Sequence, residues 1–323
     1  MSNTDTFFNL PKQALKVLPN TLAVAWSGGA DSTALLHYFK AEGYAVSAWH
    51  IDHGWSALSA KQVVPLAQRA EAWGIPFYCK TLQKPKQNIE AESRQLRYAA
   101  FSDLADETQC FNLVLGHHLE DQAETVCMRL LQGAGVAGCQ GMRRVRKQGN
   151  LFLHRPFLHV KKAKIKQYLH AQDIDWLEDP SNQDVRIWRN KIRHQLFPMM
   201  QSQGVEPADL FLRYQKQAIK VQHNIEMLAG NHLIDVIDEA GRHGCRMGWQ
   251  QWLAQSSSVR VYLLQKMIGI LFADGKVLGR RHFKAIEQWR KHGANGWVSL
   301  SGCYLERQGE SLKIFKGNQK LSA

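Results

Sequence analysis

The first 131 residues alternate between short apolar runs and segments with helical spacing, and this alternation limits the folds open to the chain. The apolar runs predict buried parallel strands at 21–26, 45–49, 75–79 and 111–115. The segments between and after them predict helices at 32–39, 59–73, 91–106 and 119–131. Strand and helix in strict alternation indicate a parallel sheet with helices on both faces, so we expect a doubly wound α/β domain.

Charge divides the chain into two unlike parts. Residues 1–140 hold 11 Lys and Arg against 13 Asp and Glu, whereas residues 141–323 hold 30 against 15. A basic second part favours a polyanionic partner, and nucleic acid is the first candidate because bound cations release its counterions. We place the domains at 1–205 and 206–323. Helices at 208–230, 257–273 and 279–291 and strands at 297–300, 304–306 and 312–315 predict a smaller, basic α+β domain in the second part.

Several classes of protein are disfavoured by composition. No run of about 18 apolar residues is present, so no membrane span is expected. Residues 1–10 lack the basic and apolar regions of a secretory leader. The six cysteines form no CxxC pair, and a disulfide framework is not expected at this length. These features predict a cytoplasmic protein with free thiols.

The segment Ser27-Gly28-Gly29-Ala30-Asp31-Ser32 joins the first predicted strand to the first predicted helix. Glycines let the backbone approach an anion, and the start of a helix offers free N–H groups and a positive dipole end. The two serine hydroxyls add donors, so the segment predicts a phosphate-binding loop. No lysine follows the glycines, which separates it from the loop of kinases and GTPases. The alternative is a plain turn with Asp31 or Ser32 as the helix N-cap.

Polar clusters also follow the second and fourth predicted strands, whose carboxyl ends meet at the sheet edge where ligands bind. His50 and His53 either contact a nucleotide or phosphate or cap the loop, and too few partners lie nearby for zinc. His117, Asp121 and Glu124 share one helix face by their spacing. Their carboxylates suit Mg²⁺ or a substrate ammonium group, or they complement the helix dipole.

Residues 88–98 form a charged helical stretch that carries Arg94 and Arg97. Glu90 with Arg94, and Arg94 with Tyr98, stand four residues apart, which is the spacing of ordinary pairs on a helix surface. The alternative is that Arg94 and Arg97 face the phosphates of a nucleotide or an RNA.

Taken together, these segments resemble the tRNA(Ile)-lysidine synthase family of PP-loop ATP pyrophosphatases. The resemblance runs from Leu22 to Pro198 and rests on motifs in the family's order: SGGADS at 27–32, HIDHG at 50–54, NIEAESRQLRY at 88–98, HHLEDQAET at 117–125, QGAGVAGCQGM at 132–142, RPF at 155–157, DPSN at 179–182 and RNKIR at 189–193. The chain departs from the family pattern at Trp55 and Ser56, and at Glu120 where the family usually has Asp.

The resemblance implies an adenine nucleotide alpha hydrolase-like fold and an ATP-dependent ligase. The wobble cytidine in the CAU anticodon of tRNA(Ile) is adenylated by ATP with Mg²⁺. The ε-amine of free L-lysine then displaces AMP to give lysidine, which changes decoding from AUG to AUA. The basic second domain would bind the tRNA. The oligomeric state stays open, with a homodimer as one alternative.

The resemblance also implies a set of site residues. Catalytic roles fall to Asp31, Asp121 and Glu124, with Asp31 and Asp121 as magnesium ligands. The nucleotide would be bound by Ser27, Gly28, Gly29, Ala30, Asp31, Ser32, His50 and His53. The tRNA or lysine would be bound by Arg94, Arg97, His117, His118, Arg143, Arg144, Arg189, Asn190 and Arg193.

Two other functions share parts of this pattern. Cytidine and uridine thiolases of tRNA use the same loop, but they rely on paired cysteines that this chain lacks. A non-catalytic tRNA-binding protein with a degenerate nucleotide site is the other alternative, and the intact SGGADS loop argues against it.

Overall fold

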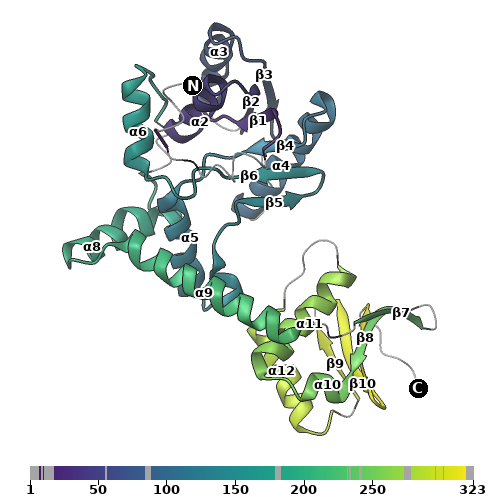
Figure 1. Ribbon diagram of the computed structural model, residues 1–323. Helices are drawn as coiled ribbons and strands as arrows, with labels where there is room; N and C mark the ends of the chain where they lie inside the picture. Colours follow the sequence, from purple (N-terminus) through teal and green to yellow (C-terminus); the bar gives the residue numbers. More distant parts are fainter. Residues whose placement is uncertain are drawn as a thin grey trace. The chain divides into compact units, whose positions relative to one another are not determined.

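The computed structural model describes residues 7–8, 10, 18–54, 57–83, 89–178, 183–230, 232, 234–239, 242–272, 278–294, 296–300 and 302–317. The chain forms two compact units, residues 1–218 and 219–323 (Figure 1). The division falls inside a long helix, residues Pro207–Ala229, whereas the sequence predicted a boundary at 205/206. The motif at 179–182 lies outside the described residues, as do Trp55 and Ser56.

The first unit is built around a six-stranded sheet in the order β3-β2-β1-β4-β6-β5. Its strands are β1 (Thr21–Ala25), β2 (Ala45–Asp52), β3 (Phe77–Thr81), β4 (Asn112–Val114), β5 (Val145–Gln148) and β6 (Leu151–His154). All neighbours pair in parallel except β5, which pairs antiparallel with β6 at one edge. The carboxyl ends of β1, β2 and β4 therefore meet at one edge of the sheet.

Helices connect and follow these strands. They are α2 (Ala30–Ala41), α3 (Ala57–Ala72), α4 (Ile89–Thr108), α5 (Leu119–Leu131), the short 3-10 helix η1 (Val136–Gln140), α6 (Lys162–Ala171), α7 (Trp188–Lys191), the π-helical η3 (Ile192–Leu196), α8 (Phe197–Ser202) and α9 (Pro207–Ala229). The expected doubly wound α/β fold is confirmed.

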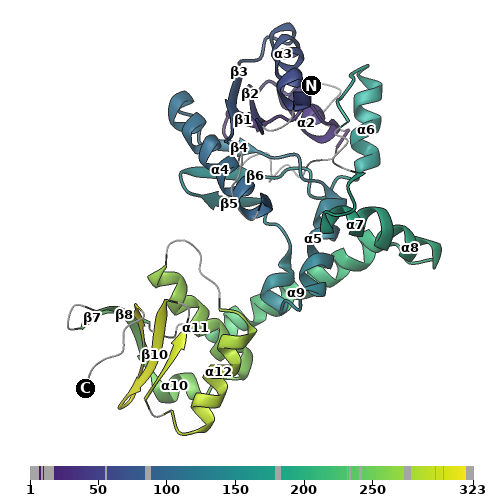
Figure 2. The ribbon, with the colours of Figure 1, turned by 180° about the vertical axis from the view of Figure 1, so that it is seen from behind.

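Alternation along the strands explains why helices cover both faces. In β1, Leu22 and Val24 pack into one core with residues of α2, α3 and α6, whereas Ala23 packs into a second core with residues of α4. Figures 1 and 2 show α2 and α6 on one side of the sheet and α4 on the other. Side chains that alternate between two buried faces require the continuous apolar runs seen in the sequence.

The hairpin of β5 and β6 was not predicted from the sequence. Strand β5 reads Val-Arg-Lys-Gln and is mostly exposed. Charged residues on an edge strand discourage pairing with other chains, and they also hide the strand from pattern analysis. Residues of β6 instead pack into the core beside α4.

The second unit is a five-stranded antiparallel sheet in the order β7-β8-β11-β10-β9. Its elements are β7 (Asp235–Glu239), β8 (Arg242–Gly248), α10 (Trp249–Leu253), α11 (Ser257–Leu271), α12 (Arg280–Lys291), β9 (Trp297–Leu300), β10 (Cys303–Gln308) and β11 (Ser311–Lys316). One core joins the sheet to the helices and includes Trp252, Leu263 and Ile314. This confirms the smaller α+β domain, with β7 and β8 as additional strands.

In the part of the chain that the structure describes, no helix has both the length and the apolar character that a membrane crossing needs.

Candidate active site

A cavity of about 500 Å³ opens at the carboxyl ends of β1, β2 and β4. This is the edge at which the sequence predicted that the polar clusters would meet, and the volume is typical of a small-molecule site. The described residues that line it are Ala25, Trp26, Ser27, Gly29, Asp31, Ser32, Trp49, Ile51, His53, Arg94, Arg97, Tyr98, Phe101, Leu115, Gly116, His117, His118, Asp121, Lys162, Arg189, Asn190 and Arg193.

The loop between β1 and α2 forms one wall of this cavity. Gly28 has a φ of +80°, and its carbonyl accepts a hydrogen bond of 3.1 Å from Thr33 Oγ1. The Ser32 hydroxyl donates to the Gly29 carbonyl at 3.1 Å and accepts from the Ser27 N–H at 3.2 Å. These bonds fold the loop around the start of α2, whose first N–H groups have no partner within the helix. The result is a concave set of donors suited to an anion.

Asp31, the second residue of α2, is held by a lysine from a distant part of the chain. Lys162 Nζ donates to Asp31 Oδ1 at 2.6 Å and to Oδ2 at 2.5 Å. The backbone N–H of Lys162 donates to Glu120 Oε2 at 3.0 Å, which joins the start of α6 to the start of α5. Lys162 was not predicted as a site residue from the sequence.

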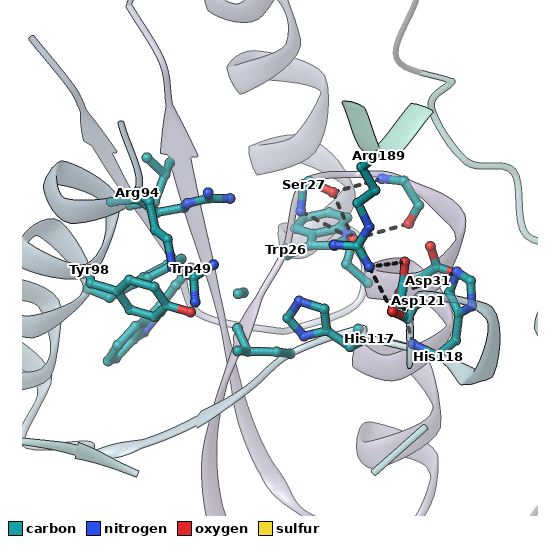
Figure 3. A pocket seen from close by; sticks show the side chains of 18 of the residues that line it. Trp26, Ser27, Asp31, Trp49, Arg94, Tyr98, His117, His118, Asp121 and Arg189 are labelled. Carbon is teal, nitrogen blue, oxygen red and sulfur yellow. Dashed lines mark hydrogen bonds and ion pairs between the residues drawn. The ribbon is translucent and has the colours of Figure 1, made fainter. Parts of the chain in front are cut away.

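His118 lies between three carboxylates at the start of α5. Its Nδ1 donates to Glu120 Oε2 at 2.9 Å, and its Nε2 lies 3.4 Å from Asp121 Oδ2 and 3.9 Å from Asp31 Oδ1. Figure 3 shows Asp31, His118 and Asp121 gathered together. Burial alone would lower the pKa of His118, but its hydrogen bond to Glu120 and the neighbouring charges raise it above the ordinary value.

His117 points into the same cavity but carries a different charge. Burial, the largest cause, and the nearby arginines Arg155, Arg189 and Arg94 lower its pKa from 6.5 to about 3. The imidazole is therefore neutral near pH 7, and its buried Nδ1 has no hydrogen-bond partner among the residues that the structure describes. Adjacent histidines thus give the site one neutral ring and one ring that favours the charged form.

These opposite shifts predict the titration of the two rings. We expect the imidazole of His118 to titrate above 6.5 and that of His117 to titrate near 3. Because the folded pKa of His118 is raised, its protonation stabilises the fold below pH 6.5, and this contribution is lost as pH rises through the folded value. NMR titration of histidine-labelled protein measures both values, with His117→Gln and His118→Gln to assign the signals. Two midpoints near 6.5 would contradict the arrangement.

Asp121 and Glu124 share two arginines that follow much later in the chain. Arg189 Nη2 and Arg193 Nη2 donate to Asp121 Oδ1 at 3.0 and 3.1 Å. The two Nε groups donate to Glu124 at 2.7 Å each. Burial alone would raise the pKa of Asp121, but the positive charge on His118 and Arg189 outweighs it and holds the pKa at about 2. Asp121 is therefore an ionised carboxylate at the cavity wall.

Glu124 lies behind that wall. Its side chain is 1% exposed, and it is not among the residues that line the cavity. Its two carboxylate oxygens are occupied by the arginines, so it orients them and does not reach a ligand directly. A π-helical turn, η3, begins directly after α7 and carries Arg193. Such turns are frequent at functional sites.

The two histidines of the HIDHG motif have different places. His53 lines the cavity, whereas His50 is buried and its Nδ1 donates to the Trp26 carbonyl at 2.9 Å. Strand β2 continues to Asp52, so Trp49, Ile51 and His53 face the cavity and His50 faces the opposite side. His50 joins β1 to β2, and burial lowers its pKa.

The predicted arginines also divide into two groups. Arg94 and Arg97 come from α4 and line the cavity, and the Arg94 guanidinium lies 5.1 Å from the centre of the Tyr98 ring (Figure 3). Arg143 and Arg144 have exposed side chains away from the cavity, and their carbonyls accept hydrogen bonds from Arg155. Gly28 and Ala30 support the loop without lining the cavity.

Protein side chains supply only part of the ligand set that a magnesium ion needs. Asp31 and Asp121 both lie within 4 Å of the His118 ring, so their carboxylates stand close enough to share one neighbour. Among the described residues, no group of three or more His, Cys, Asp or Glu is placed to hold a metal. Magnesium commonly takes one or two carboxylates together with substrate phosphates, and this pair meets that requirement.

Comparison with known proteins agrees with this geometry. Residues 5–200 match the model of the PP-loop domain. A tRNA(Ile)-lysidine synthase of Chlamydia muridarum is 33% identical over 222 residues, which cover 67% of this chain and 68% of the relative. The corresponding protein of Legionella pneumophila (strain Paris) is 35% identical over 221 residues, or 67% of this chain and 51% of the relative. The chain thus spans about half the length of the Legionella protein.

A solved structure shares the fold at low sequence identity. The U34-tRNA thiolase NcsA from Methanococcus maripaludis, with its [4Fe-4S] cluster, superposes with a TM-score of 0.53 at 15% identity. The match covers 67% of this chain and 80% of the thiolase. The PP-loop match over residues 5–200 and the coverage of the Chlamydia relative show that the chain belongs to the tRNA(Ile)-lysidine synthases of the PP-loop family.

Proposed function

We propose that this protein ligates free L-lysine to the wobble cytidine of tRNA(Ile) with a CAU anticodon, in the cytoplasm and at the expense of ATP. One observation carries the proposal: an anion-binding loop and an ionised carboxylate wall face one cavity at one sheet edge. The first suits a triphosphate and the second suits an ammonium group. The name of the relatives, tRNA(Ile)-lysidine synthase, joins the two substrates.

The first step is adenylation of the cytidine. The ring carbonyl oxygen of the base attacks the α-phosphorus of ATP, the bond to the β-phosphate oxygen breaks, and pyrophosphate leaves. The N–H groups at the start of α2 and the hydroxyls of Ser27 and Ser32 hold the phosphates in place. Trp26 and Trp49 lie at the cavity edge with their rings buried in the two cores behind it, so they shape its wall.

The second step is attack by lysine. After the ε-ammonium group gives a proton to solvent, the neutral amine bonds to the ring carbon that carries the adenylated oxygen. The carbon–oxygen bond breaks, AMP leaves with that oxygen, and the nitrogen releases a second proton to solvent. Free lysine carries an ammonium group at pH 7, and Asp121 is placed to bind it. With a pKa of about 2, Asp121 is a weak proton acceptor. This supports ammonium binding by Asp121 more than removal of the proton.

Magnesium belongs to the proposal as a partner of ATP. Asp31 and Asp121 are the residues that would hold it, and when bound it would neutralise charge on the phosphates. Both carboxylates are paired with cations, Asp31 with Lys162 and Asp121 with Arg189 and Arg193. Those cations hold the two carboxylates in position.

RNA binding follows from charge and aromatic surface. Arg94 and Arg97, with Tyr98 and Phe101, line the wall formed by α4. Recognition of single-stranded RNA generally stacks splayed bases on aromatic rings and arginine planes. We assign the wobble base to this wall, and we assign the tRNA backbone to exposed arginines such as Arg143 and Arg144 and to the basic second domain. Phosphate contacts of this kind position the tRNA without specifying it.

The cysteines argue against the thiolase alternative. All six are free thiols, and none is among the described residues that line the cavity. Burial raises the pKa of Cys127 and of Cys245 to about 11, which leaves little thiolate at neutral pH.

Incorporation of radiolabelled lysine into an unmodified tRNA(Ile) transcript tests the proposal. We expect label in the RNA only when ATP is present, with AMP released in parallel. A tRNA(Met) that shares the CAU anticodon is the control and should take up no label. AMP formation without incorporation of lysine would overturn the ligase assignment while keeping adenylation.

A further inference from the structure

The SGGADS loop lacks the lysine that other phosphate-binding loops carry, yet the structure brings one to it from elsewhere. Lys162 stands 131 residues after Asp31 and reaches the start of α2 from the start of α6. We propose that Lys162 binds the β- and γ-phosphates of ATP and the pyrophosphate product, in the role that a lysine within the loop has in other nucleotide-binding proteins. The inference rests on the proposed use of ATP.

The position of Lys162 is fixed by its backbone. Its N–H donates to both carboxylate oxygens of Glu120, at 3.2 and 3.0 Å, and Glu120 in turn accepts from His118. Farther along α6, Tyr168 is fully buried and its hydroxyl lies 2.8 Å from His37 Nδ1 on α2. The first contact holds the start of α6 against α5, and the second holds α6 beside α2. The lysine side chain starts from a rigid point next to the loop.

The ammonium group of Lys162 can exchange Asp31 for another acceptor. Lys162 is 34% exposed, and both it and Asp31 line the cavity. An ammonium group has three donors, and a flexible stem of four carbons lets it move between acceptors. A triphosphate offers more charge and more oxygens than the single carboxylate that Lys162 contacts. We infer that the ion pair with Asp31 holds the lysine ready and that the nucleotide draws it away.

The arginines that line the cavity bind other partners or lie on another side of it. Arg189 and Arg193 each bind both Asp121 and Glu124, and Glu124 is almost fully buried. Arg94 and Arg97 come from α4, on the opposite side of the sheet from α2 and α6. Among the described lysine and arginine side chains that line the cavity, Lys162 is the one with a hydrogen bond to a residue of the loop. That contact places its ammonium group beside the loop that would hold the phosphates.

Calorimetric binding of metal-free ATP, pyrophosphate and AMP, in the presence of a chelator, tests the inference. Lys162→Met should lower the affinities for ATP and for pyrophosphate by about 10- to 100-fold, because one hydrogen bond to a charged group is lost. AMP should bind equally to both proteins, because it lacks the β- and γ-phosphates. Lys161→Met is the matched control. Lys161 is exposed at the start of the same helix, and its replacement removes the same charge. It should change none of the three affinities.

A second comparison separates phosphate binding from neutralisation of Asp31. If Lys162 only cancels the charge of Asp31, Asp31→Asn combined with Lys162→Met will restore the affinity for metal-free ATP. If Lys162 binds phosphate, the double variant will stay as weak as Lys162→Met. Restored affinity, an unchanged affinity in Lys162→Met, or an equal loss of AMP binding would each overturn the inference. Labelled-lysine incorporation by the unaltered protein reports separately on the proposed function.

Discussion

Replacing Gly28 with alanine is expected to weaken ATP binding by about 30-fold or more, through strain and crowding combined. Gly28 has a φ of +80°, and a Cβ there would lie 2.7 Å from Leu177 Cδ1 and 2.9 Å from Leu66 Cδ2. Leu66 is 2% exposed within the core, so its methyl group moves only by displacing other core atoms. The Leu177 N–H donates to the Gly28 carbonyl at 2.9 Å, so Leu177 cannot retreat independently of the loop.

Gly43→Ala is the matched control for this variant. Gly43 has a φ of +84°, but a Cβ there meets nothing within 4 Å. The substitution therefore carries the backbone strain, about 1 kcal/mol, without the crowding. Calorimetric titration with ATP should show normal affinity for Gly43→Ala and a large loss for Gly28→Ala. Equal affinities in the two variants would contradict the view that Gly28 shapes the phosphate site.

Glu124→Gln is expected to reduce lysine ligation by about 100-fold while leaving the binding of metal-free ATP unchanged. The amide keeps the shape of the side chain but removes the charge that both Arg189 and Arg193 contact at 2.7 Å. The arginines would then bind Asp121 alone and compete with the lysine ammonium for it. Removing one partner from a buried ion network typically costs about 3 kcal/mol of stability. A lower urea midpoint should accompany the loss of ligation.

Asp184→Asn provides the comparison for Glu124→Gln. Asp184 makes a two-pronged pair with Arg186, with contacts of 2.9 and 2.8 Å, but the arginine is 89% exposed. Exposed pairs contribute little to stability, so ligation and the urea midpoint should match those of the unaltered protein. Full ligation by Glu124→Gln, or loss of its ATP binding together with ligation, would contradict the separation of the two halves of the site.

The position of the site was predictable from local sequence. Glycines between an apolar strand and a helix predicted the loop at 27–32, and parallel strand ends explain why Asp121 and His117 meet it. These inferences needed only neighbouring residues and the period of the apolar pattern. The fold class followed in the same way, because strands buried on both faces require continuous apolar runs.

The partners within the site were not predictable in this way. Lys162 meets Asp31 across 131 residues, and Arg189 meets Glu124 across 65, so no local pattern joins them. Glu124 shares a helix face with Asp121, as its spacing predicts, but burial under two arginines removes it from the cavity. His50 is absent from the cavity because β2 runs to Asp52. His50 therefore lies within the strand, on the face opposite Trp49 and Ile51.

The fate of the cytidine carbonyl oxygen tests the central claim most directly. A tRNA(Ile) whose wobble cytidine carries heavy oxygen at the ring carbonyl can be allowed to react with ATP and lysine, and the released AMP analysed by mass spectrometry. Adenylation at that oxygen, followed by displacement by lysine, predicts that the heavy oxygen appears in AMP and disappears from the modified base. Heavy oxygen retained in the RNA, with unlabelled AMP, would contradict the proposed route.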